Sequence, residues 1–156
     1  MQTDYKTMSR ADIIHELGKY FKLSEIVCPH TMSVHGSRSW QFFETEALRA
    51  LLILRVNVLG VPLVCNTGSH TQRGYRCNLC QLVKDATING KLYLTPHNGR
   101  GFDVTSSAMD AETMRKRIEE NADEFPVPIR IEDGVRWLHI DTIDNGKGVK
   151  VYRFKA

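Results

Sequence analysis

The fold depends on residues 129–142, which run Ile129-Arg-Ile-Glu-Asp-Gly-Val-Arg-Trp-Leu-His-Ile-Asp-Thr142. Two runs that alternate in the manner of β-strands, 129–132 and 135–142, flank the dipeptide Asp133-Gly134. Asp-Gly between two such runs is a strong signal for a β-hairpin with a two-residue turn. We therefore predict two antiparallel strands in this stretch.

A two-residue turn would fix the register of this hairpin. Glu132 would pair with Val135, and His139 would pair with Pro128. Since successive side chains on a strand point to opposite faces, Glu132 would then share a face with Trp137 and His139. The hairpin therefore places a carboxylate, an aromatic ring and an imidazole on one surface.

Hydrophobic spacing predicts the remaining elements. We expect helices over about 9–21, 39–59 and 110–125, and strands over 61–65, 101–105 and 149–154. Ser9 is the expected N-cap of the first helix, and Gly60 the expected C-cap of the second. Glycine and asparagine recur through residues 66–101, where we expect a long irregular loop with a functional role. The sum predicts an α+β fold, with N-terminal helices packed on a mostly antiparallel sheet, in a single domain covering residues 1–156.

Charge and composition exclude several classes of partner. The chain has 156 residues, of which 42% are hydrophobic and 25% charged, and its net charge is +3. That charge is too small to indicate nucleic-acid binding. The sequence shows neither a signal peptide nor an apolar run of about 18 residues, so we expect synthesis in the cytoplasm, no membrane partner and a monomer. Arg115, Lys116 and Arg117 are interpreted as a solvated helix face.

The chain has four cysteines, Cys28, Cys65, Cys77 and Cys80. Without a secretion signal, we expect reduced thiols. Cys77 and Cys80 have the CxxC spacing of a zinc site, which would need a second pair of ligands, and Cys28-Pro-His30 is the candidate for that pair. We favour buried side chains without a metal and keep this structural zinc site as the alternative.

A second candidate metal site combines His97, Asp103 and His139. A catalytic zinc site needs three protein ligands and one open position for water. His97 and Asp103 belong to a turn that leads into the strand 101–105, and His139 lies within the strand 135–142. His97 and Asp103 can point inward from this loop–strand junction, and His139 can meet them from a neighbouring strand. His70 is the alternative to His97.

These segments resemble the zinc peptidases that include D-Ala-D-Ala carboxypeptidases, D-Ala-D-Ala dipeptidases and phage L-alanyl-D-glutamate endopeptidases. The signalling domain of Hedgehog proteins shares their fold. The matching segments lie in order between about residues 21 and 141, and are His97, Gly99–Asp103, Trp137–Asp141 and Gly74–Asn78. The segment from His97 to Asp103 is one residue shorter than the pattern of that family, and Arg73 stands where the family has a serine.

The resemblance implies a zinc-dependent metallopeptidase, a peptidoglycan hydrolase that cuts peptide bonds of the stem peptides, with Zn²⁺ held by His97, Asp103 and His139. An endolysin-like endopeptidase and a D,D- or L,D-carboxypeptidase both fit, and release to the cell wall by phage lysis would follow from the first. The alternatives are a non-catalytic zinc-binding module and a phage structural protein with the same fold.

Two residues are expected to act in catalysis. Glu132 is the expected general base because the hairpin puts it on the face of His139, and Asp133 is the alternative. Arg76 is expected to stabilise an oxyanion or to bind a substrate carboxylate. Asp141 shares the face of His139 and is expected to orient its ring.

Three further residues are expected to bind the substrate. They are Arg73, Tyr75 and Trp137. Tyr75 belongs to the segment that resembles the family's Ser-Gly-Tyr-Arg motif, and Arg73 stands at the position of its serine. Trp137 precedes His139 by two residues in the predicted hairpin.

Overall fold

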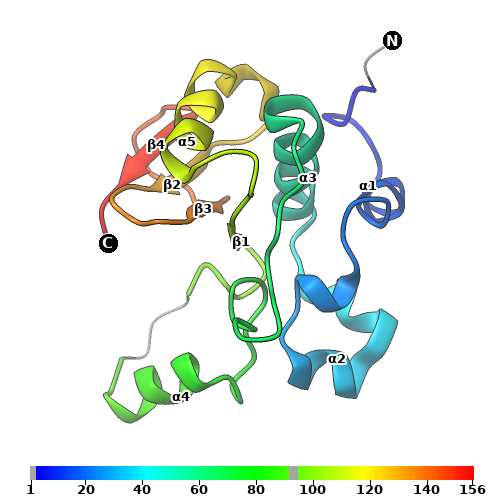
Figure 1. The fold of residues 1–156 in the computed structure, drawn as a ribbon, viewed down its shortest axis with the longest axis vertical. Helices are drawn as coiled ribbons and strands as arrows, with labels where there is room; N and C mark the ends of the chain where they lie inside the picture. Colours follow the sequence, from blue (N-terminus) through cyan, green and yellow to red (C-terminus); the bar gives the residue numbers. More distant parts are fainter. Residues whose placement is uncertain (1–2, 92–94) are drawn as a thin grey trace.

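The computed structural model describes residues 3–91 and 95–156, and it confirms the α+β fold (Figure 1). Its helices are α1 Arg10–Leu17, α2 Pro29–His35, α3 Thr45–Ile53, α4 Gln81–Ile88 and α5 Ala111–Glu120. Its strands are β1 Gly101–Val104, β2 Ile129–Glu132, β3 Leu138–Asp141 and β4 Val151–Phe154. Short 3-10 segments cover Leu23–Glu25, Gly36–Phe42 and Ala122–Glu124, and a π-helical turn, Leu54–Leu59, extends α3. Within the described ranges, none of the helices has both the length and the apolar composition needed to cross a bilayer.

The four strands form one sheet in the order β1-β3-β2-β4. The pairs β1/β3 and β3/β2 are antiparallel, and β4 joins β2 in parallel, so the prediction of a mostly antiparallel sheet is confirmed. All four residues of β1 and all four of β3 are buried. These two strands therefore lie inside the molecule, where polar side chains on them need partners.

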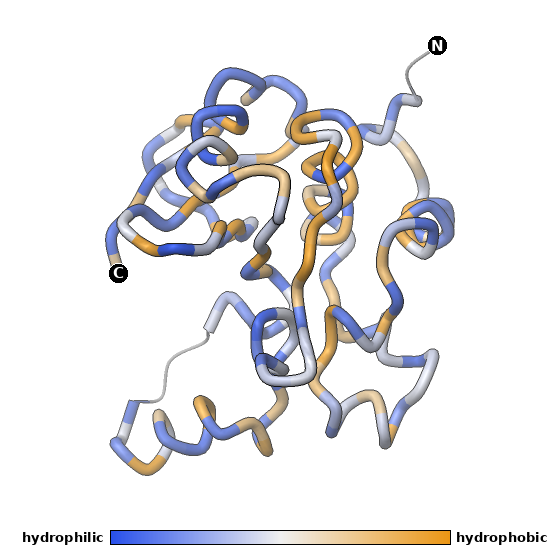
Figure 2. The backbone as a smooth tube through the Cα atoms, viewed as in Figure 1, coloured by the Kyte–Doolittle hydropathy of each residue, from blue (hydrophilic) through white to orange (hydrophobic). Residues whose placement is uncertain are grey.

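The core is built around α3, in which every residue from Ala47 to Ile53 is buried. A helix that is buried on all sides belongs to the centre of a domain. Figures 1 and 2 show α3 as an apolar column between α1 and the half of the molecule that holds the sheet. Ser9 caps α1 as predicted, because its hydroxyl accepts from the amide of Asp12.

The expected helix over 39–59 is wrong at its start. Gly36–Phe42 is 3-10 helix, and α3 begins at Thr45. The amide of Glu44 donates to the carbonyl of Gly99 at 2.9 Å. A contact with a distant loop therefore takes the amide that would have continued the helix. At the other end Gly60 has φ +65° and caps the π-helical turn, as predicted.

Two further expectations fail between residues 61 and 101. The predicted strand 61–65 contributes a single bridge, Val64 to Thr105. The stretch expected to be an irregular loop contains the helix α4, in which no residue is buried. Its apolar residues Leu82, Val83 and Ala86 have helical spacing, which the prediction of a loop overlooked. Residues 92–94 of that stretch lie outside the described residues.

The predicted register of the 129–142 hairpin is also wrong. The structure pairs Arg130 with Asp141 and Ile131 with Ile140, so the connection is a loop over 133–137 rather than a two-residue turn. Continuing this register puts Glu132 opposite His139. The register differs from the predicted one by an even number of residues, so the two side chains still share a face.

Arg115 of α5 explains the wide loop, and it corrects the interpretation of 115–117 as a solvated face. Arg115 is 3% exposed, whereas Lys116 and Arg117 are exposed as expected. Its guanidinium donates to the carbonyls of Glu132 at 2.8 Å, Val135 at 2.6 Å and Trp137 at 2.8 Å. These carbonyls are therefore bound to an arginine instead of pairing across a tight turn.

Replacing Arg115 should destabilise the protein through this loop. We expect Arg115→Met to lower the free energy of unfolding by about 2–4 kcal/mol, because it leaves three partly buried carbonyls without the donors that now bind them. Arg117→Met is the matched control on the exposed face of the same helix, with an expected change within about 0.5 kcal/mol. Chemical denaturation of both variants measures the difference, and equal stabilities would contradict this role.

Gly99 supports a second prediction. It has φ +92°, and a Cβ there would lie 2.0 Å from the carbonyl oxygen of Phe42. Gly134, with φ +77°, has open space at the same position. Gly134→Ala should cost about 1–2 kcal/mol from backbone strain, whereas Gly99→Ala should cost at least about 3 kcal/mol because a clash with backbone is added. Thermal unfolding of the pair tests this order.

Candidate functional site

Asp103 of β1 and His139 of β3 are directly opposite each other in the antiparallel pair. Nδ1 of His139 lies 2.7 Å from Oδ1 of Asp103. His97 approaches from the turn before β1, and its Nε2 lies 3.2 Å from Oδ2 of the same carboxylate. The ligand-type atoms of these three residues all lie within 4.8 Å of one another. The structure therefore brings together the three residues predicted to bind zinc, which we call the His-Asp-His cluster.

The nitrogen that points away from Asp103 is hydrogen-bonded in each ring. Nδ1 of His97 lies 2.8 Å from the carbonyl oxygen of Gly74, and since a carbonyl can only accept, this nitrogen donates. Nε2 of His139 lies 2.7 Å from a carboxylate oxygen of Asp141, the residue expected to orient the ring. Metal-binding histidines in proteins usually make such an outer hydrogen bond, which leaves the inner nitrogen free to ligate.

Arg130 holds Asp141 in place and was missed by the sequence analysis. Its guanidinium donates to both carboxylate oxygens of Asp141, at 2.8 and 2.9 Å. Arg130 and Asp141 are direct neighbours across β2 and β3. The pair could have been predicted only from the correct register, and the predicted two-residue turn gave a different one.

Charge in the cluster is strongly coupled. Burial lowers the pKa of His139, but hydrogen bonds to Asp103 and Asp141 outweigh it and raise the pKa to about 9. Burial raises the pKa of Asp103, but hydrogen bonds with His139 and His97 outweigh it and hold that pKa well below its usual range. Without a metal, His139 is therefore a cation between two carboxylates at neutral pH, and a bound metal ion would replace its proton.

One cavity opens onto the cluster. Its lining includes all three cluster residues together with Arg76, Glu132 and Trp137. A terminal nitrogen of Arg76 lies 3.7 Å from Oδ2 of Asp103, and its Nε donates to the carbonyl of Gln72. Trp137 is 38% exposed at this cavity. The two residues predicted to act in catalysis therefore lie at the same cavity as the predicted metal ligands.

Arg73 and His70 lie beside this cavity rather than in it. They line an adjoining cavity that shares Arg76, Asp103 and Trp137 with the first. The carbonyl of Arg73 accepts from the amide of Asp103 at 2.8 Å. His70 is exposed and contacts Ser69, so the structure places His97, and not its alternative, in the His-Asp-His cluster.

Tyr75 and Asp133 lie apart from the cluster. The ring of Tyr75 stacks on Phe42 with centroids 5.1 Å apart, and Tyr75 does not line the cavity of the His-Asp-His cluster. Asp133, the alternative base, accepts from Arg153 at 3.1 Å. Position therefore favours Glu132 over Asp133 as the carboxylate beside the cluster.

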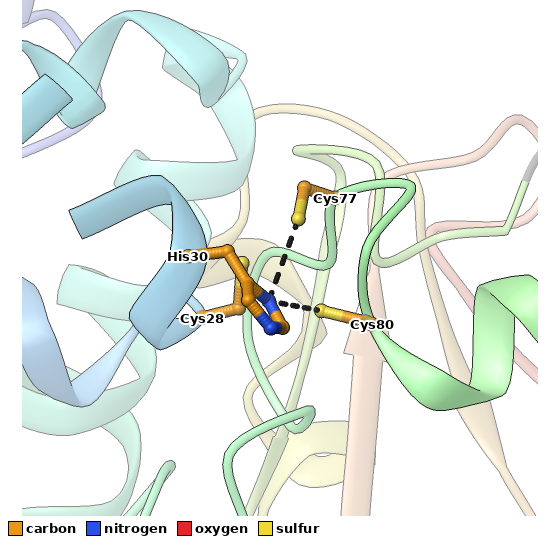
Figure 3. Close-up of side chains that lie close together, drawn as sticks. All are labelled: Cys28, His30, Cys77 and Cys80. Atoms are coloured by element: carbon orange, nitrogen blue, oxygen red, sulfur yellow. Dashed lines mark hydrogen bonds between the residues drawn. The ribbon is translucent and has the colours of Figure 1, made fainter. Parts of the chain in front are cut away.

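Three cysteines and a histidine form a second group (Figure 3). Cys28 and His30 lie at the start of α2, and Cys77 and Cys80 directly before α4. Nδ1 of His30 lies 3.7 Å from Sγ of Cys77 and 3.8 Å from Sγ of Cys80. This arrangement, which we call the Cys₃His cluster, is compatible with a zinc ion. The geometry thus favours the alternative over the preferred interpretation of metal-free thiols, which fits only Cys65, buried outside the cluster.

Two thiols of the Cys₃His cluster differ in acidity. Burial raises the pKa of Cys28, but hydrogen bonds with Thr31 and Cys77 outweigh it and lower the pKa to about 6. Burial and the neighbouring Cys28 raise the pKa of Cys80 to about 12. A metal ion bound at the cluster would favour the thiolate form of both residues.

Comparisons of the chain with protein-family models, curated proteins and solved structures found no match.

The hydrogen bond that Nε2 of His139 donates to Asp141 gives a test of the His-Asp-His cluster. Asp141→Asn should weaken zinc binding there about 10- to 100-fold, because loss of an outer partner reduces the basicity and order of the ligand. Asp144→Asn, an exposed position on the next loop, is the matched control. Titration with a competing chelator measures both affinities, and an unchanged affinity in Asp141→Asn would contradict the assignment of His139 as a ligand.

Proposed function

We propose that this chain is a zinc-dependent metallopeptidase that hydrolyses peptide bonds in the stem peptides of peptidoglycan. The observation that supports the proposal most directly is the convergence of His97, Asp103 and His139 at a cavity that Glu132 and Arg76 also line. The wall substrate rests on the resemblance to D-Ala-D-Ala peptidases and phage endopeptidases. Release to the cell wall by phage lysis belongs to the same proposal.

The residues of the His-Asp-His cluster fit a catalytic zinc ion. Two imidazoles and one carboxylate are a common ligand set of zinc hydrolases and leave one position open. Bonds of about 2.0–2.1 Å around a tetrahedral zinc ion separate two ligand atoms by roughly 3.3 Å. The 3.2 Å between His97 and Asp103 is close to this value. The 2.7 Å between His139 and Asp103 is shorter, so these two side chains would move apart to admit the ion. A zinc ion held there would polarise the scissile carbonyl and lower the pKa of a bound water to about 7.

Glu132 is proposed to move the proton. Its side chain lies at the cavity, opposite His139 in the continued register of β2 and β3. It would accept the proton of the attacking water and pass it to the leaving amine. The carbonyl of Glu132 is bound by Arg115, so the backbone that carries this base is fixed before the substrate arrives.

Arg76 and Trp137 are proposed to bind the substrate. The guanidinium of Arg76 lies beside Asp103 and can stabilise an oxyanion or hold a peptide carboxylate through two parallel hydrogen bonds. Trp137 offers a partly exposed ring where the two cavities meet. Arg73, on the adjoining cavity, would contact a substrate that extends beyond the scissile bond.

A non-catalytic zinc-binding module is the second candidate function. The Cys₃His cluster supports it, because four protein ligands leave a zinc ion without an open position. A protein of this kind would bind zinc without turning over a peptide.

Glu132→Gln separates the two candidates. Under the peptidase proposal it should lower kcat about 10²- to 10⁴-fold, since a proton carrier is lost while the metal ligands remain. Zinc content should stay at the wild-type value. Asp133→Asn is the matched control, with near-normal turnover expected.

The measurement is digestion of purified peptidoglycan with identification of the new termini by mass spectrometry, which also reveals the bond that is cut. Full activity in either Glu132→Gln or His139→Ala would rule out the proposed mechanism. Absence of turnover in the zinc-loaded wild-type protein would favour the non-catalytic module.

A further inference from the structure

We propose that Cys28, His30, Cys77 and Cys80 bind a structural zinc ion that positions Arg76 at the His-Asp-His cluster. The metal site stands on its own geometry. Its effect on substrate binding rests on the proposed function, because that function gives Arg76 its role.

The ligand set is that of a closed zinc site. Three thiols and one imidazole, supplied as Cys-x-His and Cys-x-x-Cys, occupy every position of a tetrahedral zinc ion. Nδ1 of His30 lies 3.7 Å from the sulfur of Cys77 and 3.8 Å from the sulfur of Cys80. Zn–S bonds of about 2.3 Å and Zn–N bonds of about 2.0–2.1 Å give a tetrahedral edge of roughly 3.6 Å between nitrogen and sulfur. The cluster is therefore already spaced for such an ion, with all four ligand atoms within 4.8 Å of one another.

The Cys₃His cluster is buried on one side and open to solvent on the other, so a metal ion can enter it. Cys28 and Cys80 are buried, while Cys77 is half-buried and His30 is exposed. Figure 3 shows the His30 ring next to the thiols of Cys77 and Cys80, with Cys28 from the same helix start beside it. All four cysteines of the chain are free thiols, so no disulfide competes for these sulfurs.

The part of the chain that carries Cys77 and Cys80 has almost no core of its own. From residue 66 to residue 91, Gly74 and Cys80 are the buried residues, and α4 buries none. Figure 1 shows α4 at the periphery, away from α3 and the sheet. A segment that buries so little apolar surface needs another source of order, and in small folds a bound metal often supplies it.

The backbone around the cluster leads directly to Arg76. The amide of Cys28 donates to the carbonyl of Tyr75 at 3.0 Å, and the amide of Tyr75 donates to the carbonyl of Ile26 at 2.8 Å. Gly74 permits this approach, because a Cβ there would lie 2.0 Å from the oxygen of Ile26. On the far side, the amide of Arg76 donates to the carbonyl of His97 at 2.9 Å.

The backbone of Arg76 is therefore held on both sides, in addition to the contacts of its side chain with Gln72 and Asp103. Cys77, the next residue, would be tied to α2 through zinc, and the amide of Arg76 is tied to the loop of His97. Loss of the structural zinc would release the Cys77 end and let the guanidinium leave the cavity, while the His-Asp-His cluster keeps its own ligands. The zinc would act as a positioning element and would not contact the substrate.

Cobalt substitution in reduced protein tests the metal site without any activity measurement. Thiolate-bound Co²⁺ gives a sulfur-to-metal charge-transfer absorption that a site of histidine and aspartate lacks. We expect one equivalent of this absorption in the wild-type protein, a lower intensity per metal and weaker Co²⁺ binding in Cys77→Ala, weaker Co²⁺ binding with the band retained in His30→Ala, and no change in His139→Ala. Cys65→Ala, a buried cysteine outside the cluster, is the matched control and should retain it. His30 is exposed, so its replacement keeps the test valid if Cys77→Ala fails to fold.

Absence of the absorption in the wild-type protein, or an unchanged intensity and affinity in both cluster variants, would overturn the metal site. Total zinc should fall from two equivalents to one in His139→Ala and, in the presence of a competing chelator, in His30→Ala. A wild-type protein with one equivalent of thiolate-bound metal and no peptidase activity would refute the proposed function while leaving the structural zinc intact.

The positioning role has its own readouts. In His30→Ala, hydrogen exchange should increase in residues 74–91 and stay unchanged in β1 and β3. kcat/KM for stem peptides should fall about 10-fold or more, through a higher KM where Arg76 holds a substrate carboxylate and through a lower kcat where it stabilises the oxyanion. An unchanged exchange pattern together with an unchanged kcat/KM would overturn the positioning role.

Discussion

Asp103 and His139 face each other across the β1/β3 pair, with 2.7 Å between carboxylate and ring. Both strands are buried along their whole length, so neither charge can be left to water, and an unpaired buried charge costs several kcal/mol. If the pairing of β1 with β3 shifted by one residue, Asp103 and His139 would lie on opposite faces of the sheet and could not meet. The pairing of Asp103 with His139 therefore depends on the register of the two buried strands, and it stabilises that register in turn. His97 then approaches the carboxylate of Asp103 from the turn before β1.

Two arginines support that arrangement from outside. Arg130 binds both oxygens of Asp141 and so orients the ring of His139. Arg115 binds three carbonyls of the loop between β2 and β3 and so shapes the edge of the cavity where Trp137 lies. An arginine suits both tasks because its planar guanidinium has five donors and remains charged when buried. Polar contacts from Arg130 and Arg115 thus hold the β2 and β3 side of the His-Asp-His cluster, and the apolar core holds β1, through Phe102 and Val104.

Four consecutive residues connect the two clusters. The carbonyl of Gly74 holds the ring of His97, Tyr75 pairs with Val27, Arg76 reaches Asp103, and Cys77 belongs to the Cys₃His cluster. The half of the molecule around α3 has a continuous apolar core, whereas residues 66–91 have almost none. A metal at the Cys₃His cluster would compensate for that lack, and the side of the cavity that Arg76 forms would then depend on it.

The sequence by itself determined the α+β class, the four strands, the start of α1 and the end of the helical segment at Gly60. These features follow from local spacing, capping and turn residues, which act over a few positions. Only the tertiary structure decided the hairpin register, the helix break before Thr45, the burial of Arg115 and the meeting of the two cysteine-containing pairs. Each of these depends on a contact between residues far apart in the chain, such as Glu44 with Gly99. Local spacing offered Cys28 and His30 as partners for Cys77 and Cys80, but it could not decide whether the two pairs meet.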